Sequence, residues 1–315
     1  MATGLLARPH GARPLDARIR PSAVAPVNLP APTLSAMDDV RRDPQTDQER
    51  LAGLVAVWWE AVNSFTRLLE GVGKDGWRTP TDLPGWDVHA VAAHTAHLEA
   101  LLAGRPHDEL EVGESGHVRG AMGSFTEQGV LARRDHTPDA LLAEIRESAT
   151  ARHTQLLAEP PTDPSAPAPG AFGAIGWTTG LLLRNRPLDV WMHEQDVRRA
   201  LDIPGNLDSA AAVHTTDYLL ESLPYVVGKR AQAPVGSVVR LEVAGHAPAT
   251  VVVGQDGRGR PADPGDGEPA VTLATDREGF VLLAGGRRGA DRVDVRLSGD
   301  TALGERVLAS MAVTP

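Results

Sequence analysis

The spacing of apolar residues changes near residue 225, and this change constrains the fold more than any other feature of the sequence. Upstream, apolar side chains recur every three or four residues along several segments, which places them on one face of a helix. Downstream, segments such as 238–243 (Val-Val-Arg-Leu-Glu-Val) alternate apolar and polar positions, as strands do. The change predicts a helical region followed by a smaller α+β domain.

Four long helices and a shorter fifth are expected before residue 225. The predicted segments are 51–69, 87–104, 138–158, 180–201 or 187–201, and 208–220. Asp87, Thr137 and Asp208 are expected to cap the second, third and fifth helices, because short polar side chains accept hydrogen bonds from free N–H groups at helix starts. Residues 104–129 are polar and Gly-rich and show no firm pattern. Four long helices joined by loops favour an antiparallel four-helix bundle.

The C-terminal part is expected to combine short strands with short helices. The predicted strands are 238–243, 249–253, 271–274 and 293–297, and the predicted helices are 280–284 and 302–309. The chain is thus divided into a Pro- and Arg-rich arm (1–44), a helical bundle (45–223) and an α+β domain (224–315). The composition of the arm is typical of disordered segments.

Charge and composition exclude several classes of protein. Lys and Arg total 31 against 41 Asp and Glu, a net charge of −10, which disfavours binding to nucleic acid or to an anionic membrane. The longest apolar stretch, 51–59, is far shorter than the roughly 20 residues of a membrane-spanning helix. The N-terminal residues lack the apolar core of a secretory signal. We therefore expect a cytoplasmic protein, monomeric or homodimeric, that acts on small molecules.

Three side chains that can bind metal fall on the expected interior faces of two helices. His94 lies between Val91 and Leu98 at spacings of three and four residues. Asp189 and His193 are four residues apart and project from one face of the fourth helix. Together they would offer three ligands to one ion and leave positions open, as catalytic sites do. The chain has no cysteine, so any metal must be held by histidine and carboxylate.

Each of these features also has a simpler interpretation. A buried histidine is often a hydrogen-bonded core residue, and an Asp–His pair four residues apart is often a hydrogen bond on a helix surface. Spacing alone leaves both interpretations open beside the metal site.

Charged neighbours of these residues are less natural ligands. Glu194 lies about 100° around the helix from His193. Asp196 could orient His193 or pair with Arg199, and the sequence favours the arginine pair. His97 is expected at the edge of the apolar face of its helix rather than at its centre.

The run 285–288 (Gly-Gly-Arg-Arg) is a further feature of the C-terminal part. No phosphate-binding loop precedes a helix at this point. The pattern favours a turn with solvent-exposed arginines over a phosphate site.

Three motifs resemble those of a known family. The motifs are 83–88 with 91–94 (Leu-Pro-Gly-Trp-Asp-Val and Val-Ala-Ala-His), 187–198 (Pro-Leu-Asp-Val-Trp-Met-His-Glu-Gln-Asp-Val-Arg), and 283–288, 297–300 and 306–308 in the C-terminal part. In this order they resemble the mycothiol-dependent maleylpyruvate isomerase family, within the DinB/YfiT-like metalloprotein superfamily. The resemblance covers residues 47–315.

The resemblance implies a DinB-like four-helix bundle that holds a divalent metal, usually zinc. His94, Asp189 and His193 occupy the ligand positions of the family, although the characterised isomerase has the longer Glu where this chain has Asp189. It further implies that the thiolate of mycothiol, a small-molecule thiol, attacks an activated substrate near the metal. An arginine of the C-terminal domain, here Arg287 or Arg288, would help to bind a substrate carboxylate.

These observations support three hypotheses. The first is a metal-dependent isomerase or S-transferase that uses mycothiol on a small electrophile, because a zinc ion makes a bound thiol nucleophilic at neutral pH. The second is a metal-dependent hydrolase in which the open positions activate water. The third is a non-catalytic binding or regulatory module that has kept the bundle and lost the metal.

Overall fold

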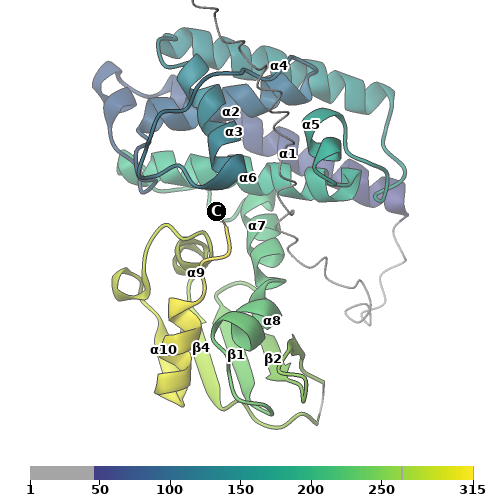
Figure 1. The fold of residues 1–315 in the computed structure, drawn as a ribbon, viewed down its shortest axis with the longest axis vertical. Helices are drawn as coiled ribbons and strands as arrows, with labels where there is room; N and C mark the ends of the chain where they lie inside the picture. Colours follow the sequence, from purple (N-terminus) through teal and green to yellow (C-terminus); the bar gives the residue numbers. More distant parts are fainter. Residues whose placement is uncertain (1–45, 264, 315) are drawn as a thin grey trace, which may run out of the picture. The chain divides into compact units, whose positions relative to one another are not determined.

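A computed structural model describes residues 46–263 and 265–314 of the chain. It contains a helical N-terminal region followed by a domain built on a mixed five-stranded sheet (Figure 1). The predicted fold class, a helical bundle with a smaller α+β domain, is therefore confirmed. The predicted arm, residues 1–44, lies outside the described residues, and the boundary predicted between residues 223 and 224 stays a prediction.

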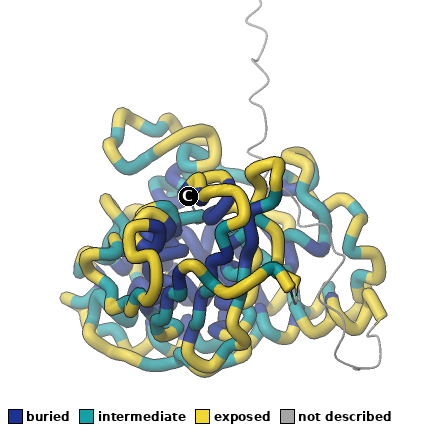
Figure 2. Tube along the Cα trace, turned by 90° about the horizontal axis from the view of Figure 1, so that it is seen from below, coloured by how far each residue is buried: buried dark blue, intermediate teal, exposed yellow. Residues whose placement is uncertain are grey.

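Four long helices form the bundle. They are α1 (Asp47–Glu70), α2 (Val88–Leu102), α4 (Pro138–Ala158) and α6 (Thr179–Ala200). Helices α1 and α2 each pack against both α4 and α6, so that every long helix contacts two others. Trp58, Phe65, Ile145 and Trp191 are fully buried between them. In Figure 2, buried segments of the chain lie inside and exposed segments surround them.

Side-chain caps begin all four long helices. Thr46, Asp87, Thr137 and Thr178 each accept a hydrogen bond from a backbone N–H group in the first turn of their helix. The caps predicted at Asp87 and Thr137 are thus confirmed. Satisfying an otherwise free N–H group in this way stabilises a helix by about 1 kcal/mol.

The prediction for the fifth helix was wrong at its cap. Helix α7 (Ala210–Leu220) begins after Ser209, whose side chain accepts from the N–H of Ala212. Asp208 lies one residue earlier and instead forms an ion pair with Arg277, 69 residues away in the sequence. The local sequence predicted Asp208 as the cap, but its carboxylate pairs with a residue that is distant in the sequence.

Shorter helices complete the helical region. They are η1 (Lys74–Arg78), α3 (Gly120–Ala132) and α5 (Gly170–Ala174). Helix α3 occupies the segment where the sequence showed no pattern, because it buries only Glu127, Gly129 and Val130 and so carries no apolar stripe. None of the described helices is both long and apolar enough to cross a membrane.

The C-terminal sheet has the strand order β3-β2-β1-β4-β5. The strands are β1 (Val238–Val243), β2 (Ala249–Val253), β3 (Gly259–Pro261), β4 (Val271–Thr275) and β5 (Arg296–Gly299). Strands β1 and β4 are parallel, and the other neighbours are antiparallel. The prediction of a strand at 293–297 was wrong by three residues, and the three-residue strand β3 was not predicted.

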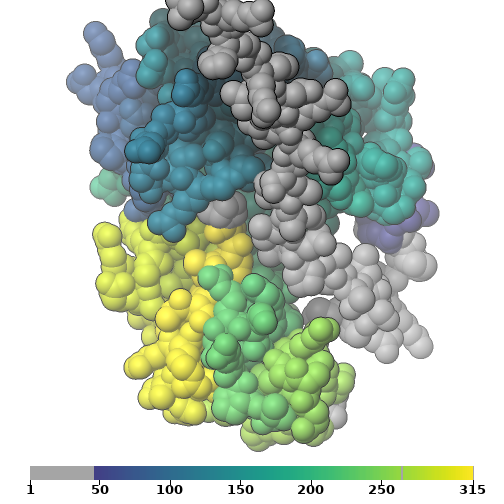
Figure 3. Space-filling model, in the orientation of Figure 1, coloured from purple at the N-terminus to yellow at the C-terminus, as the bar shows by residue number. Residues whose placement is uncertain are grey.

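Helices cover and connect the strands. They are α8 (Leu223–Tyr225), η2 (Val226–Arg230), α9 (Arg277–Ala284), η3 (Ala290–Arg292) and α10 (Thr301–Ala309). Helix α10 packs against β4 and β5, whereas α9 packs against α7 of the helical region. In the space-filling view, the purple-to-teal helical region and the green-to-yellow C-terminal part occupy separate areas of the visible face (Figure 3).

Gly129 allows α3 to pack closely against α2. A Cβ atom at this position would lie 2.1 Å from Cγ of His97, a side chain that is 1% exposed. We expect Gly129→Ala to lower the free energy of unfolding by about 1–3 kcal/mol through overpacking. Gly123→Ala is the matched control on the same helix, because the nearest neighbouring atom would be 3.6 Å away. Urea unfolding of both variants checks this, and equal free energies would contradict it.

Candidate metal centre

His94, Asp189 and His193 come together in the bundle, as the sequence predicted. His94 comes from α2, and the other two come from successive turns of α6. One ligand atom from each lies within 4.8 Å of the other two. Within residues 46–263 and 265–314, this is the one group of three or more such side chains with this geometry. Both histidines are buried, and the side chain of Asp189 is 21% exposed.

The separations between these side chains fit a single ion. Nε2 of His94 lies 3.5 Å from Oδ2 of Asp189, and Nε2 of His193 lies 3.6 Å from Oδ1 of the same carboxylate. A tetrahedral ion with bonds of about 2.0–2.2 Å holds its ligand atoms about 3.4 Å apart. The observed separations match that spacing and are too long for direct hydrogen bonds of normal strength.

The surroundings of His94 fit a metal ligand most clearly. Both of its ring nitrogens are buried and have no hydrogen-bond partner among the described residues. A buried polar atom without a partner costs about 1–3 kcal/mol, so native structures rarely retain one. Burial also lowers the pKa of His94, which favours the neutral imidazole that binds metals.

Asp189 is held in its ionised form by its neighbours. Burial alone would raise the pKa of this carboxyl group, but the charge of Arg186 and the nearby imidazoles of His94 and His193 hold it well below its usual range. Nη1 of Arg186 donates a 2.8 Å hydrogen bond to Oδ2 of Asp189. The same carboxylate can therefore be oriented by the arginine and still present Oδ1 toward His193.

Arg186 belongs to a buried charged network that the sequence analysis missed. Its Nη2 donates a 2.7 Å hydrogen bond to Oε1 of Glu99, which also accepts from Nε1 of Trp58. Nη1 of Arg152 lies 3.6 Å from Oε2 of Glu99, and burial lowers the pKa of Arg152 to about 10. Glu99 is 0% exposed, Arg186 1% and Arg152 4%. Charged residues at interior positions of three helices were the available signal.

His193 is oriented by Asp196. Its Nδ1 lies 3.2 Å from Oδ2 of this fully buried carboxylate, so Nδ1 carries the proton and Nε2 faces Asp189. Asp196 also accepts a 2.6 Å hydrogen bond from Nη2 of Arg199. The predicted pair between Asp196 and Arg199 is thus confirmed, and the less favoured alternative, the contact with His193, is present as well.

The two arginines of the C-terminal turn also contact the helical region. Arg287, 8% exposed, donates to both oxygens of Asp196. Arg288, 30% exposed, donates to Asp82 at 3.3 Å. The expectation of solvent-exposed arginines was wrong for Arg287, because a buried carboxylate lies opposite it. The role predicted for these arginines in substrate binding stays a prediction.

Two other residues considered from the sequence lie outside the cluster. Glu194 is buried and accepts hydrogen bonds from Arg198, Asn206 and Ser64. His97 was expected at the edge of the apolar face of its helix, and this placement stays a prediction. It is 1% exposed, because α3 covers that side of α2.

Trp86 forms an aromatic wall beside the cluster. Its ring centroid lies 5.1 Å from that of His94 and 6.1 Å from that of His193. Its Nε1 donates a 3.0 Å hydrogen bond to Oε2 of Glu127 on α3. The indole thus shields both imidazoles while its polar atom is satisfied outside the cluster.

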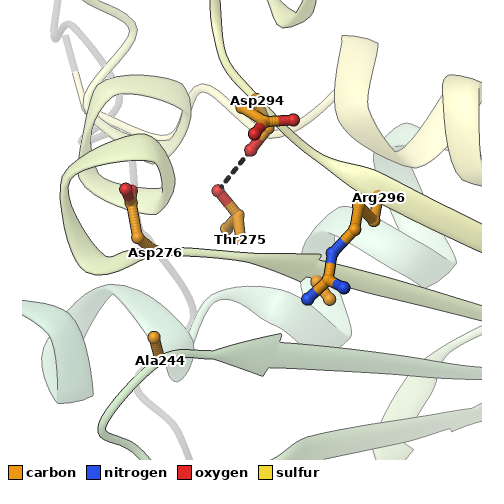
Figure 4. Close-up of a pocket in the computed structure, with 6 residues that line it drawn as sticks. Ala244, Thr275, Asp276, Asp294 and Arg296 are labelled. Atoms are coloured by element: carbon orange, nitrogen blue, oxygen red, sulfur yellow. Dashed lines mark hydrogen bonds between the residues drawn. The ribbon is translucent and has the colours of Figure 1, made fainter.

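Two open cavities are lined by other residues. One, of about 240 Å³, lies at the carboxyl ends of β1 and β4, where Oγ1 of Thr275 donates to the carbonyl of Asp294 (Figure 4). The other, of about 360 Å³, is lined by Lys74, Asp75, Trp77, Arg78, His89, His136 and Pro138. Neither includes a member of the His94 cluster.

A helical bundle with a buried His/Asp/His cluster, followed by a mixed-sheet domain, defines a class of two-domain proteins. Residues 58–198 match the family model described as "Mycothiol maleylpyruvate isomerase N-terminal domain", and residues 211–306 match "MDMPI C-terminal domain". The chain therefore belongs to the mycothiol maleylpyruvate isomerase family, as the resemblance of its motifs predicted.

Two solved structures are similar to this chain. Both are crystal structures of the mycothiol-dependent maleylpyruvate isomerase, one of them a point mutant. The mutant is 18% identical with a TM-score of 0.47, and the other is 17% identical with a TM-score of 0.48. Each match covers 80% of this chain and 95% of the solved one. No curated protein sequence matches the chain significantly.

Proposed function

We propose that this protein is a metal-dependent enzyme that uses a low-molecular-weight thiol, mycothiol, to isomerise or conjugate a small electrophile. The observation that carries the proposal is the convergence of His94, Asp189 and His193, with both ring nitrogens of His94 buried and unpartnered among the described residues. The family name adds the thiol and the class of reaction.

The chain itself would supply the ligands of the metal. His94, Asp189 and His193 would hold a divalent ion, for which zinc is the best match to two imidazoles and a carboxylate. A bound ion of this kind lowers the pKa of a coordinated thiol, so that thiolate is available at neutral pH. The thiol must come from outside, because the chain has no cysteine.

An arginine of the C-terminal turn would bind a carboxylate of the substrate. Arg287 already pairs with Asp196, whereas Arg288 is 30% exposed and makes only long contacts with Asp82. Arg288 is therefore the better candidate for binding a substrate carboxylate. Thiol addition to an activated double bond gives isomerisation if the thiol leaves again and conjugation if it stays.

Metal content tests the proposal directly. We expect about one equivalent of zinc or another divalent ion per chain in protein purified without chelator or affinity tag. His94→Ala and His193→Ala should each lose it, because three ligands are the minimum set here. His214→Ala is the control, since its Nε2 bonds the carbonyl of Arg184 outside the cluster. Elemental analysis with no ion in the wild type, even after zinc is offered, would contradict the proposal.

Thiol dependence then separates the chemistries. A thiol-using enzyme should be inactive toward electrophilic substrates until mycothiol is added. A metal-dependent hydrolase should hydrolyse its substrates equally well without any thiol. Activity independent of thiol would therefore retain the metal site and overturn the thiol part of the proposal.

A further inference from the structure

We propose that Arg287 of the C-terminal domain is a positioning residue for the metal ligand His193, acting through Asp196. It would fix the imidazole with Nδ1 protonated and Nε2 directed at Asp189, and so set the metal affinity of the bundle. The metal-affinity part rests on the proposed metal site. The role differs from binding substrate, because Arg287 reaches the site through a buried carboxylate.

The contact between Arg287 and Asp196 has two parallel hydrogen bonds. Nε of Arg287 lies 3.2 Å from Oδ1, and Nη2 lies 3.1 Å from Oδ2. Oδ2 is also the atom that Nδ1 of His193 approaches at 3.2 Å. A planar guanidinium that contacts both oxygens fixes the plane of the carboxylate. The direction of the acceptor for His193 is fixed with it.

The remaining nitrogen of Arg287 anchors the side chain to its own turn. Nη1 donates a 2.7 Å hydrogen bond to the carbonyl of Gly285. The backbone at Gly286 has φ +64°, a left-handed conformation that favours glycine. The arginine thus donates to both oxygens of Asp196, to the carbonyl of the turn and, at 3.4 Å, to Oγ1 of Thr314.

The turn itself lies directly against the ligand helix. A Cβ atom at Gly285 would lie 2.5 Å from Cε of Met192, the residue before His193 on α6. Only glycine permits this approach without displacing the neighbouring side chain. The close contact and the paired hydrogen bonds are separate observations, and both bring the C-terminal turn against side chains of α6.

Arg199 cannot replace Arg287 in this role. It reaches only Oδ1 of Asp196, and its Nε donates to Asp82 at 2.7 Å. Without Arg287, the described structure would leave one partner on each oxygen, Arg199 on Oδ1 and His193 on Oδ2, and no group that contacts both and fixes the plane of the carboxylate. The proton on Nδ1 would then lose its fixed acceptor, and the tautomer with Nε2 protonated, which cannot bind the ion through Nε2, would become accessible.

Zinc affinity gives the first test. We expect Arg287→Met to raise the dissociation constant for zinc, measured by competition with a chelator, by about 10–100-fold, as outer partners of metal ligands do. Arg287→Lys keeps the charge but cannot contact both oxygens, so we expect a smaller increase. Arg277→Met is the matched control, because Arg277 is also a poorly exposed arginine (11%) that pairs with a carboxylate of the helical region, Asp208. It should leave zinc affinity within about twofold.

The tautomer of His193 gives a second test that needs no metal. Imidazole ¹⁵N shifts of metal-free protein, recorded at alkaline pH where the ring is neutral, should show Nδ1 protonated in the wild type. Arg287→Met or, should that variant not fold, Arg287→Lys should show a mixture of tautomers. Unchanged shifts together with unchanged zinc affinity would overturn the inference. A wild type that binds no zinc would overturn the proposed function. The tautomer of His193 would still test the positioning role of Arg287.

Discussion

Glu99→Ala should lower the free energy of unfolding by about 3–5 kcal/mol, the cost of removing one partner from a buried ion pair. Glu99 is completely buried, and the guanidinium groups of Arg186 and Arg152 lie 2.7 and 3.6 Å from its oxygens. Without Glu99, Arg186 keeps Asp189 as its partner, whereas among the described residues Arg152 keeps only the face of Trp58, 4.5 Å from the ring centroid. Nε1 of Trp58 also loses its acceptor.

Chemical denaturation monitored by circular dichroism measures this loss. Glu147→Ala is the matched control, because Glu147 also pairs with an arginine, Arg105 at 3.6 Å, but is 71% exposed. An exposed pair of this kind contributes at most about 1 kcal/mol. If the two variants lost the same free energy, the buried network would not be important for stability.

Asp189→Asn should weaken zinc binding by more than about 100-fold, beyond the effect of losing an outer partner of a ligand. The substitution keeps the size of the side chain but removes the negative charge that lies between the two imidazoles. It also places an uncharged amide against Nη1 of Arg186, which now donates to Oδ2 at 2.8 Å. The positive charge of Arg186 would then oppose the ion with less compensation.

The measurement is a zinc titration against a competing chelator. Asp217→Asn is the control, because it alters another Asp–His pair, with His246 at 2.9 Å, outside the cluster. The control should bind zinc as the wild type does. Retention of wild-type affinity by Asp189→Asn would exclude this carboxylate as a ligand.

Local patterns predicted those parts of the fold whose stability is local. The apolar face of α1 is visible in the sequence because a helix repeats every few residues. The caps of α2 and α4 are visible because short polar side chains are typical of helix starts. Helix α3 buries too few residues to carry such a pattern. Strand β3 has three residues, and its pairing with β2 comes from tertiary structure rather than from alternation. These elements could not be predicted from spacing.

The candidate site could likewise be predicted only in part. Asp189 and His193 are one helical turn apart, so their common face could be predicted from sequence alone. The partners that orient them are distant in sequence. Arg186 binds Glu99 across 87 residues, and Arg287 binds Asp196 across 91. The sequence shows which charged residues could form such pairs. It does not show which of them pair, because that depends on how α2, α6 and the C-terminal turn pack.

The Gly-Gly-Arg turn affects how this family can be recombined in the laboratory. Gly285 fits against Met192, and Arg287 pairs with Asp196, so part of the environment of the bundle is encoded in the other domain. A chimera that joins this bundle to a foreign C-terminal domain would carry Asp196 opposite whatever residue the new turn supplies. Exchangeable units should therefore be chosen so that the turn and residues 192–199 of α6 come from the same parent.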